Sequence, residues 1–297
     1  MDPAILQFLA APIVASLIIA GIHAYLGLHV VERGVIFVDL SLAQIASLGA
    51  TIAVLVPALG GDPHSPGVYW MSLGFTIIGA LIFSMIRGHE ANVPQEAIIG
   101  ITYAVASAAV IVVMSKAPGE SEHLKDMLVG NILSVQWPEV WTTGALYAVI
   151  GLFHYIFRHR FLQISVNAKA AAAQGISLRL WDFLFYASFG FVVTRSVAIA
   201  GVLLVFCYLI VPSVGGILFS DRIGPRLAIG WIMGTFVSML GMYFSVVFDL
   251  PTGAAIVCTF GIVLILMAAV RAMVVSVPAT ETKVLNRAAE KRSSSAS

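Results

Sequence analysis

The sequence predicts an all-α polytopic membrane protein with about eight or nine transmembrane helices. Of its 297 residues, 60% are hydrophobic and only 10% are charged, and the mean hydropathy is +0.98. A soluble domain carries about 25% charged residues, which cover its surface. So few charges exclude a cytosolic enzyme, a DNA-binding domain and a disordered protein. The net charge of +1 is uninformative, so the positions of the charges matter more than their sum.

Nine stretches are long and apolar enough to cross a bilayer as helices, for which about 20 apolar residues suffice. They cover, in chain order, residues 8–31, 35–59, 67–86, 97–115, 140–157, 181–194, 197–219, 227–248 and 252–270. The sixth and seventh share one apolar block that is interrupted by Arg195 and is about twice as long as one crossing needs. We therefore expect two helices joined by a tight turn near Arg195, and a short interfacial or re-entrant helix over residues 127–136.

The basic residues predict how these spans are oriented, because cytoplasmic loops are enriched in Lys and Arg. With the N-terminus outside and nine spans, all of the 16 Lys and Arg residues except Lys116, Lys125 and Arg195 fall on the inner side. We therefore expect an outer N-terminus and a transmembrane domain over residues 1–275. The polar tail, residues 276–297, is expected in the cytoplasm and disordered.

Polar side chains within the spans are functional candidates, because burying them at membrane depth is costly. The second span carries Asp39, Ser41, Gln44 and Ser47. The last three share one helix face, and Asp39 stands about 140° around the helix from Gln44. Oxygen ligands of this kind suit a hard or borderline divalent cation. We expect the four to line a transport path, with Asp39 and Gln44 as candidate metal ligands; the alternative is hydrogen bonding between helices.

The remaining residues that could carry chemistry form no recognisable site in the sequence. None of the seven histidines has metal-ligand spacing, so each is expected at the surface or the membrane interface. Cys207 and Cys258 lie in apolar runs and are expected to be buried. The sequence contains neither a phosphate-binding loop nor a standard hydrolase signature. These features favour a pore or permease that is powered by another protein over an enzyme.

The longest inner loop, about residues 158–180, predicts a short cytoplasmic helix. Residues 168–173 are rich in alanine, which strongly favours helix, and Gly175 is expected to end the helix as a left-handed cap. The loop and its flanking segments resemble the permeases of the ABC-3 family, the membrane subunits of bacterial ABC importers for zinc, manganese or iron. The similar motifs are Val31-Glu-Arg33 leading into Leu42-Ala-Gln-Ile-Ala-Ser-Leu-Gly49, Glu96-Ala-Ile-Ile-Gly100, residues 124–133, Ala171-Ala-Ala-Gln-Gly175-Ile176, and the run from Gly201 to Pro212.

These motifs follow the family's order over most of residues 10–271, with one departure. The family usually has a histidine four residues after an aspartate in the second span, whereas Gln44 stands here, five residues after Asp39. A glutamine oxygen is a weaker zinc ligand than an imidazole nitrogen. Manganese, iron or a changed substrate therefore stay open beside zinc.

The resemblance implies a bundle like that of type II ABC importer permeases in the bacterial plasma membrane. It implies ATP-driven import of a divalent metal ion, with no covalently bound cofactor and no enzymatic activity in this chain. The implied partners are cytoplasmic ATP-binding subunits, an extracytoplasmic metal-binding protein and a second copy of the chain, and no nucleic acid. The residues implied to couple to the ATP-binding subunits are Asn167, Ala171, Gln174 and Gly175. The alternatives are an ABC permease for a metal chelate and a secondary transporter with its own coupling ion.

Overall fold

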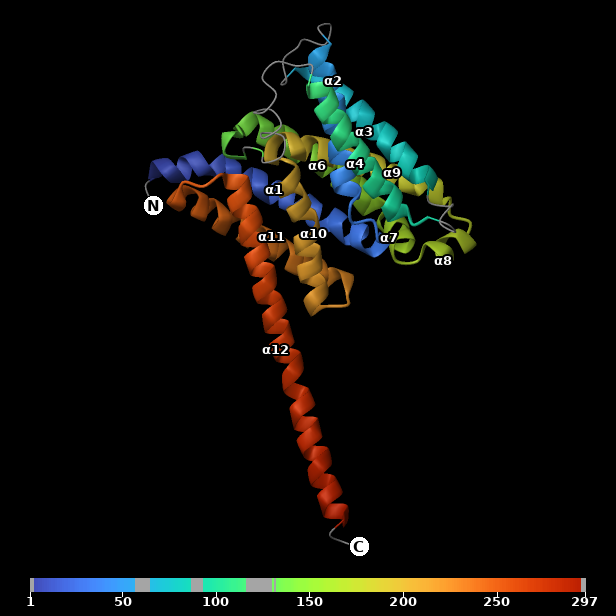
Figure 1. The fold of residues 1–297 in the computed structure, drawn as a ribbon, viewed down its shortest axis with the longest axis vertical. Coiled ribbons are helices and arrows are strands. Elements are labelled where there is room, and N and C mark those ends of the chain that lie inside the picture. The colour runs from blue at the N-terminus through green and yellow to red at the C-terminus, as the bar shows by residue number, and fades with distance from the viewer. Residues whose placement is uncertain (1–2, 57–64, 87–92, 116–129, 131, 295–297) are drawn as a thin grey trace.

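The computed structural model describes residues 3–56, 65–86, 93–115, 130 and 132–294, and all regular structure within these ranges is helical (Figure 1). The elements are α1 (Pro3–Arg33), α2 (Val38–Leu55), α3 (Pro66–Ile86), α4 (Gln95–Met114), the short 3-10 helix η2 (Ile132–Ser134), α6 (Trp137–Ile156), α7 (Arg158–Val166), α8 (Ala168–Ala173), α9 (Leu178–Ala200), α10 (Val202–Phe219), α11 (Ile223–Phe248) and α12 (Thr252–Ser294).

The predicted all-α membrane fold is confirmed. Within the described residues, eight helices are long and apolar enough to cross a membrane, and the pair α6 and α7, bent by 73°, makes a ninth if it is counted as one span. Each of the nine predicted spans coincides with one of these helices. Of the short helix expected over residues 127–136, only the part from residue 132 and residue 130 are described, and there η2 is a single 3-10 turn.

The break between the sixth and seventh spans lies at Gly201, so the turn predicted near Arg195 is wrong. α9 continues through Arg195 to Ala200, and α10 begins directly after Gly201, whose φ is +76°. Glycine adopts this conformation without the steric penalty of a side chain. Arg195 stays within the helix because its guanidinium donates to the hydroxyls of Thr143 (2.9 Å) and Thr142 (3.1 Å) on α6.

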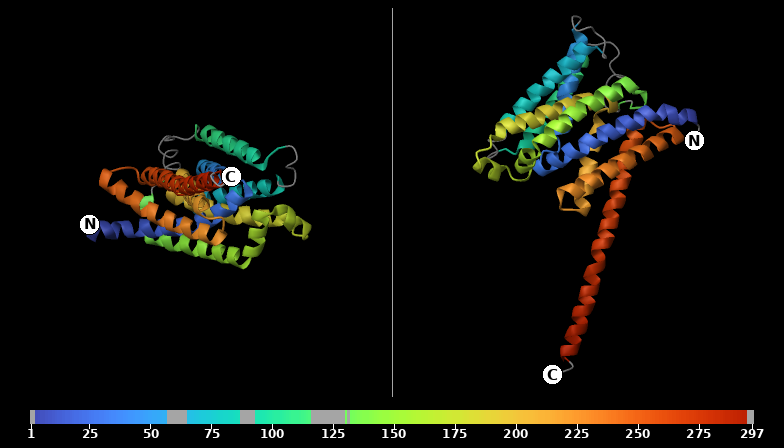
Figure 2. Two further views of the ribbon diagram at one scale, coloured as in Figure 1. Left: turned by 90° about the horizontal axis from the view of Figure 1, so that it is seen from below. Right: turned by 180° about the vertical axis from the view of Figure 1, so that it is seen from behind.

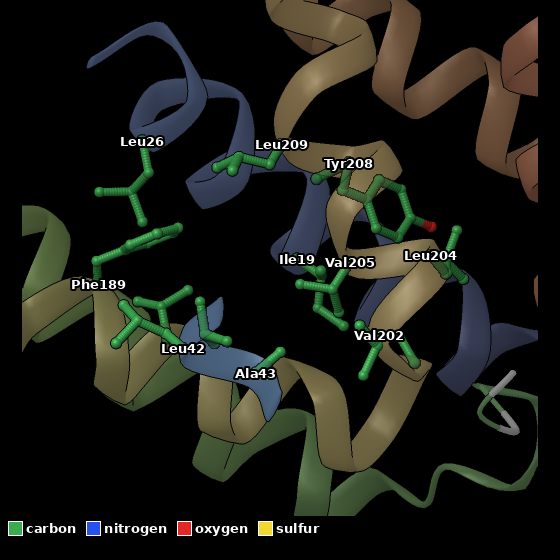
Figure 3. Packing of buried hydrophobic residues seen from close by; sticks show 14 of the residues in the cluster. Ile19, Leu26, Leu42, Ala43, Phe189, Val202, Leu204, Val205, Tyr208 and Leu209 are labelled. Carbon is green, nitrogen blue, oxygen red and sulfur yellow. The ribbon is translucent and has the colours of Figure 1, made fainter. Parts of the chain in front are cut away.

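The core lies between two groups of helices. α10 packs against α1, α11 and α12, while α2 packs against α3, α4 and α9. Figure 3 shows the apolar side chains between these groups, including Leu26 of α1, Leu42 of α2 and Phe189 of α9. α1 and α10 approach closely at Gly27, where an added Cβ would lie 2.0 Å from the carbonyl oxygen of Leu209. Seen from behind, α6 runs beside α1 (Figure 2).

The C-terminal segment continues the last helix. α12 extends to Ser294 and projects away from the bundle (Figures 1 and 2). The expectation of a cytoplasmic, disordered tail over residues 276–297 stays a prediction. Residues 281–292 are rich in Glu, Lys, Leu, Arg and Ala, which favour helix. Adding residues to an existing helix also avoids the unfavourable nucleation step.

Candidate functional site

A tight turn after α1 positions the polar row of α2. Gly34 has a φ of +69°, and the backbone nitrogen of Val35 donates back to Val30 (3.2 Å), which closes the end of α1. The backbone nitrogen of Phe37 donates to the carboxylate of Glu96 at the start of α4 (2.9 Å). The beginning of α2 is therefore fixed to the beginning of α4, and the first polar residue of the row follows within one turn.

All four predicted transport-path residues are buried inside this bundle. Asp39, Ser41, Gln44 and Ser47 lie on α2, which is surrounded by α3, α4 and α9. Among the described residues, Asp39 Oδ1 and Ser41 Oγ are buried without a hydrogen-bond partner. Leaving a buried carboxylate oxygen unpaired is unfavourable, so such an atom calls for an explanation. One explanation is that this oxygen is open to a passing cation.

The polar row does not belong to a larger cluster of metal ligands. Within the described part of the chain, no group of three or more His, Cys, Asp and Glu side chains is placed to hold a metal ion. The structure places Asp39 and Gln44 on one buried helix, and their role as metal ligands stays a prediction. A transported ion needs only weak and transient ligands, because it must also leave.

The loop helix predicted from its alanines is confirmed as α8, Ala168–Ala173. Asn167 begins it as the N-cap, and its side-chain oxygen accepts from the backbone nitrogen of Ala170 (2.9 Å). Gly175 follows its end with a φ of +77°, as the cap prediction requires. The short helix is therefore closed at both ends by its own residues.

The four predicted coupling residues differ in what they contact. Ala171 is fully buried in a small core with Ile164 of α7 and Ile176, so it holds the loop together. Gln174 accepts from the side chain of Gln163 on α7 (2.5 Å) and is exposed. Gly175 is exposed, and an added Cβ there would meet no atom within 4 Å. The outer surface of the loop around Gly175 is therefore exposed.

A buried charged cluster at the same end of the bundle was not predicted. Arg33 Nη1 donates to Asp182 Oδ1 on α9 (2.5 Å), and Arg33 Nε donates to Ser165 Oγ on α7 (2.9 Å). The guanidinium carbon also lies 4.0 Å from the centre of the Phe185 ring. These partners are more than 130 residues away from Arg33 in the sequence, so no spacing rule could find them.

The histidines expected at surfaces include three that are buried. His23 and His29 lie inside α1, and His154 lies inside α6. His29 Nδ1 is 2.9 Å from Ser165 Oγ, and His154 Nε2 is 2.8 Å from Ser188 Oγ. For His29 and His154 the expectation failed because spacing along one helix cannot reveal a serine on another helix; His23 Nδ1 instead lies 2.8 Å from the backbone oxygen of Ile19 on its own helix. His64, His89 and His123 lie outside the described residues. The expected burial of the two cysteines also fails for Cys258, which is exposed.

A model of the ABC 3 transport family matches residues 5–271. The chain belongs to this family. The match covers all of the helices described above, apart from the extreme N-terminus and the projecting end of α12. It confirms the membership that the ordered motifs of the sequence suggested.

Two relatives illustrate the similarity. The chain is 28% identical over 224 residues to the manganese transport system membrane protein MntC of Halalkalibacterium halodurans, which covers 71% of this chain and 76% of the relative. It is 21% identical over 259 residues to the manganese import system permease protein ScaB of Streptococcus gordonii, covering 86% and 89%.

Two solved structures share the fold. The first is PsaBC from Streptococcus pneumoniae in complex with Fab, with a TM-score of 0.73, 23% identity and coverage of 88% of this chain and 92% of that chain. The second is an inward-facing putative metal-chelate type ABC transporter, with a TM-score of 0.68, 15% identity and coverage of 91% and 90%.

Proposed function

We propose that this ABC 3 family chain is the membrane-spanning permease subunit of an ATP-driven importer of divalent metal ions. The observation that carries the proposal is the loop helix α8, which is capped at both ends, packed on its own small core and open around Gly175. Such a rigid projection suits docking of a second protein. The names of the family relatives, which are manganese transport proteins, support a divalent metal ion as the substrate.

The polar row of α2 supplies the proposed path. Asp39 provides the only carboxylate of that row, and Ser41, Gln44 and Ser47 add neutral oxygens. A hard or borderline cation such as Mn²⁺ accepts ligands of this kind. The departure from the family's usual histidine at Gln44 favours manganese or iron over zinc, because oxygen ligands suit the harder cations.

The proposed partners of this chain are those that the family resemblance implies. Its sequence has no phosphate-binding loop, so separate cytoplasmic subunits bind ATP and dock on α8. An extracytoplasmic metal-binding protein delivers the ion at the opposite end, and a second copy of the chain completes a homodimer. In this assignment Asn167 and Ala171 build the docking loop, whereas Gln174 and Gly175 contact the ATP-binding subunit.

Two substitutions at one position test the docking loop. Gly175→Trp adds bulk to the open surface and strains the left-handed backbone, whereas Gly175→Asn adds little bulk and tolerates that backbone. We expect Gly175→Trp to abolish Mn²⁺ uptake and co-purification with the ATP-binding subunits, while the protein still inserts into the membrane. Gly175→Asn should retain both. Normal uptake by Gly175→Trp would refute the docking role of α8.

The cargo is identified by growing cells with and without the chain under metal limitation and measuring their total zinc, manganese and iron. A selective fall in one metal on deletion confirms import and names the substrate. Unchanged levels of all three would contradict divalent metal import and favour a metal chelate. Uptake that continues in the absence of any ATP-binding subunit would favour a secondary transporter.

A further inference from the structure

Two consecutive residues at the end of α1 hold opposite sides of the bundle. Arg33 donates to Asp182 of α9 and to Ser165 of α7. Its neighbour Glu32 accepts from Arg226 of α11. The end of α1 is therefore linked to the cytoplasmic loop through Arg33 and to the last part of the bundle through Glu32.

The two links differ in burial. The side chains of Arg33 and Asp182 are 1% and 0% exposed, whereas those of Arg226 and Glu32 are 15% and 25% exposed. Separating the buried pair would leave charges without compensation in a low-dielectric interior, so that pair stays closed. The less buried pair is partly screened by solvent, so we expect it to be the weaker of the two ion pairs. Arg33 thus makes the firmer ionic connection of the two.

The partners of Arg33 move with the loop helix. Ala171 of α8 packs on Ile164 of α7 and on Ile176, and Leu178 and Trp181 at the start of α9 cover the same small core. Ser165 directly follows Ile164, and Asp182 directly follows Trp181. A displacement of α8 therefore carries both polar partners of Arg33 with it, because α7, α8 and the start of α9 form one packed unit.

On its other side, Arg33 leads directly into the polar row. The turn from Gly34 to Phe37 is closed by backbone bonds of Gly34 to Val31 (3.1 Å) and of Val38 to Val35 (3.1 Å). Asp39, with its unpaired Oδ1, follows one residue after Val38. A short turn held by backbone hydrogen bonds transmits a shift of Arg33 to the start of α2.

We propose that Arg33 is a positioning residue that transmits movement of the loop helix α8 to the polar row of α2. Ser165 and Asp182 hold its guanidinium from the loop side, and the turn at Gly34 connects it to Asp39. Arg33 itself contacts no transported ion. The inference rests on the proposed function, since it requires ATP-binding subunits that displace α8.

The ratio of metal taken up to ATP hydrolysed tests this role, because a residue needed only for folding would not change it. The permease is purified with its ATP-binding subunits and reconstituted into vesicles, with Mn²⁺ as the probe and Zn²⁺ and Fe²⁺ in parallel. Arg33→Lys keeps the charge but loses the planar fork that reaches two partners, so we expect uptake per ATP to fall by about fivefold or more. Ser165→Ala leaves the ion pair intact and removes the hydrogen bonds of Ser165 Oγ to Arg33 and to His29, so we expect a fall of about threefold.

The matched control is Glu32→Gln, which alters an ion pair of the adjacent residue without touching the loop; its uptake per ATP should equal that of the unchanged protein. The proposal is overturned if Arg33→Lys, Ser165→Ala and the unchanged protein take up the same amount of metal per ATP. This includes the case in which uptake and ATP hydrolysis fall in parallel.

If Arg33→Lys fails to fold, the ratio measured for Ser165→Ala decides alone. If the unchanged protein transports none of the three ions, the proposed function fails first and the inference fails with it.

Discussion

Asp39 combines complete burial with an oxygen that has no hydrogen-bond partner among the described residues. Selection for stability alone would replace such a carboxylate, because a neutral or apolar side chain is less unfavourable in the interior. The transport path proposed above accounts for its presence through an interaction with a passing cation. This argument separates Asp39 from Ser72, a buried hydroxyl that donates to the backbone of Ala46 (2.8 Å) and has a purely structural partner.

Asp39→Asn should separate stability from transport. The amide removes an uncompensated buried charge, so we expect the free energy of unfolding in detergent to stay equal or to rise by about 1–3 kcal/mol. Mn²⁺ uptake should fall by about tenfold or more, since the carboxylate is the charged oxygen ligand of the row. Ser72→Ala is the control: it should lower the melting temperature slightly and leave uptake per folded protein unchanged. A strongly destabilised Asp39→Asn protein would indicate a structural carboxylate instead.

For single helices, signals carried by adjacent residues predicted the start and end of a helix better than the composition of a segment did. The alanines of α8 and the cap at Gly175 were predictable because helix propensity and positive φ are properties of adjacent residues. The turn at Gly201 was misplaced because an interrupting charge marks a loop only when no partner exists within the bundle. Arg195 has two partners on α6, more than 50 residues away. The Arg33 cluster escaped prediction for the same reason.

The packing of α1 on α10 gives a matched pair of glycine substitutions within one helix. A Cβ at Gly27 would lie 2.0 Å from the carbonyl oxygen of Leu209 and 2.5 Å from the hydroxyl of Ser213, whereas a Cβ at Gly21 would meet no atom within 4 Å. We expect Gly27→Ala to lower the free energy of unfolding by about 1–3 kcal/mol through overpacking. Gly21→Ala should be neutral or stabilise by up to about 1 kcal/mol, because alanine favours helix.

Thermal unfolding of both glycine variants in the same detergent compares them directly. Equal melting temperatures would mean that α1 and α10 separate at little cost, and the close approach would then not hold the bundle together. A loss confined to Gly27→Ala would show that this contact is a fixed part of the core, around which the loop and the polar row are arranged.

At the scale of the whole molecule, three exposed tryptophans of the described residues lie at the ends of the spans away from Arg33 and Arg158. Trp70 near the start of α3 and Trp137 and Trp141 at the start of α6 are exposed, and the last two stack with ring centres 5.9 Å apart. Exposed tryptophans of this kind favour a membrane–water interface. Arg33 at the end of α1 and Arg158 at the start of α7 lie at the other ends, whereas Arg195 lies on the tryptophan side, bound to Thr142 and Thr143. Lys and Arg favour the cytoplasmic side, so we infer that α8 faces the cytoplasm.

Labelling of single cysteines with a membrane-impermeant thiol reagent tests this orientation. The native thiols are first removed as Cys207→Ser and Cys258→Ser, because Cys258 is exposed. Lys169→Cys then reports on α8 and Trp137→Cys on the start of α6, and both side chains are exposed. We expect Trp137→Cys to react in intact cells and Lys169→Cys to react only after the membrane is opened. The reverse pattern would place α8 outside, where no ATP-binding subunit could reach it, and would overturn the docking role of the loop together with the proposed direction of transport.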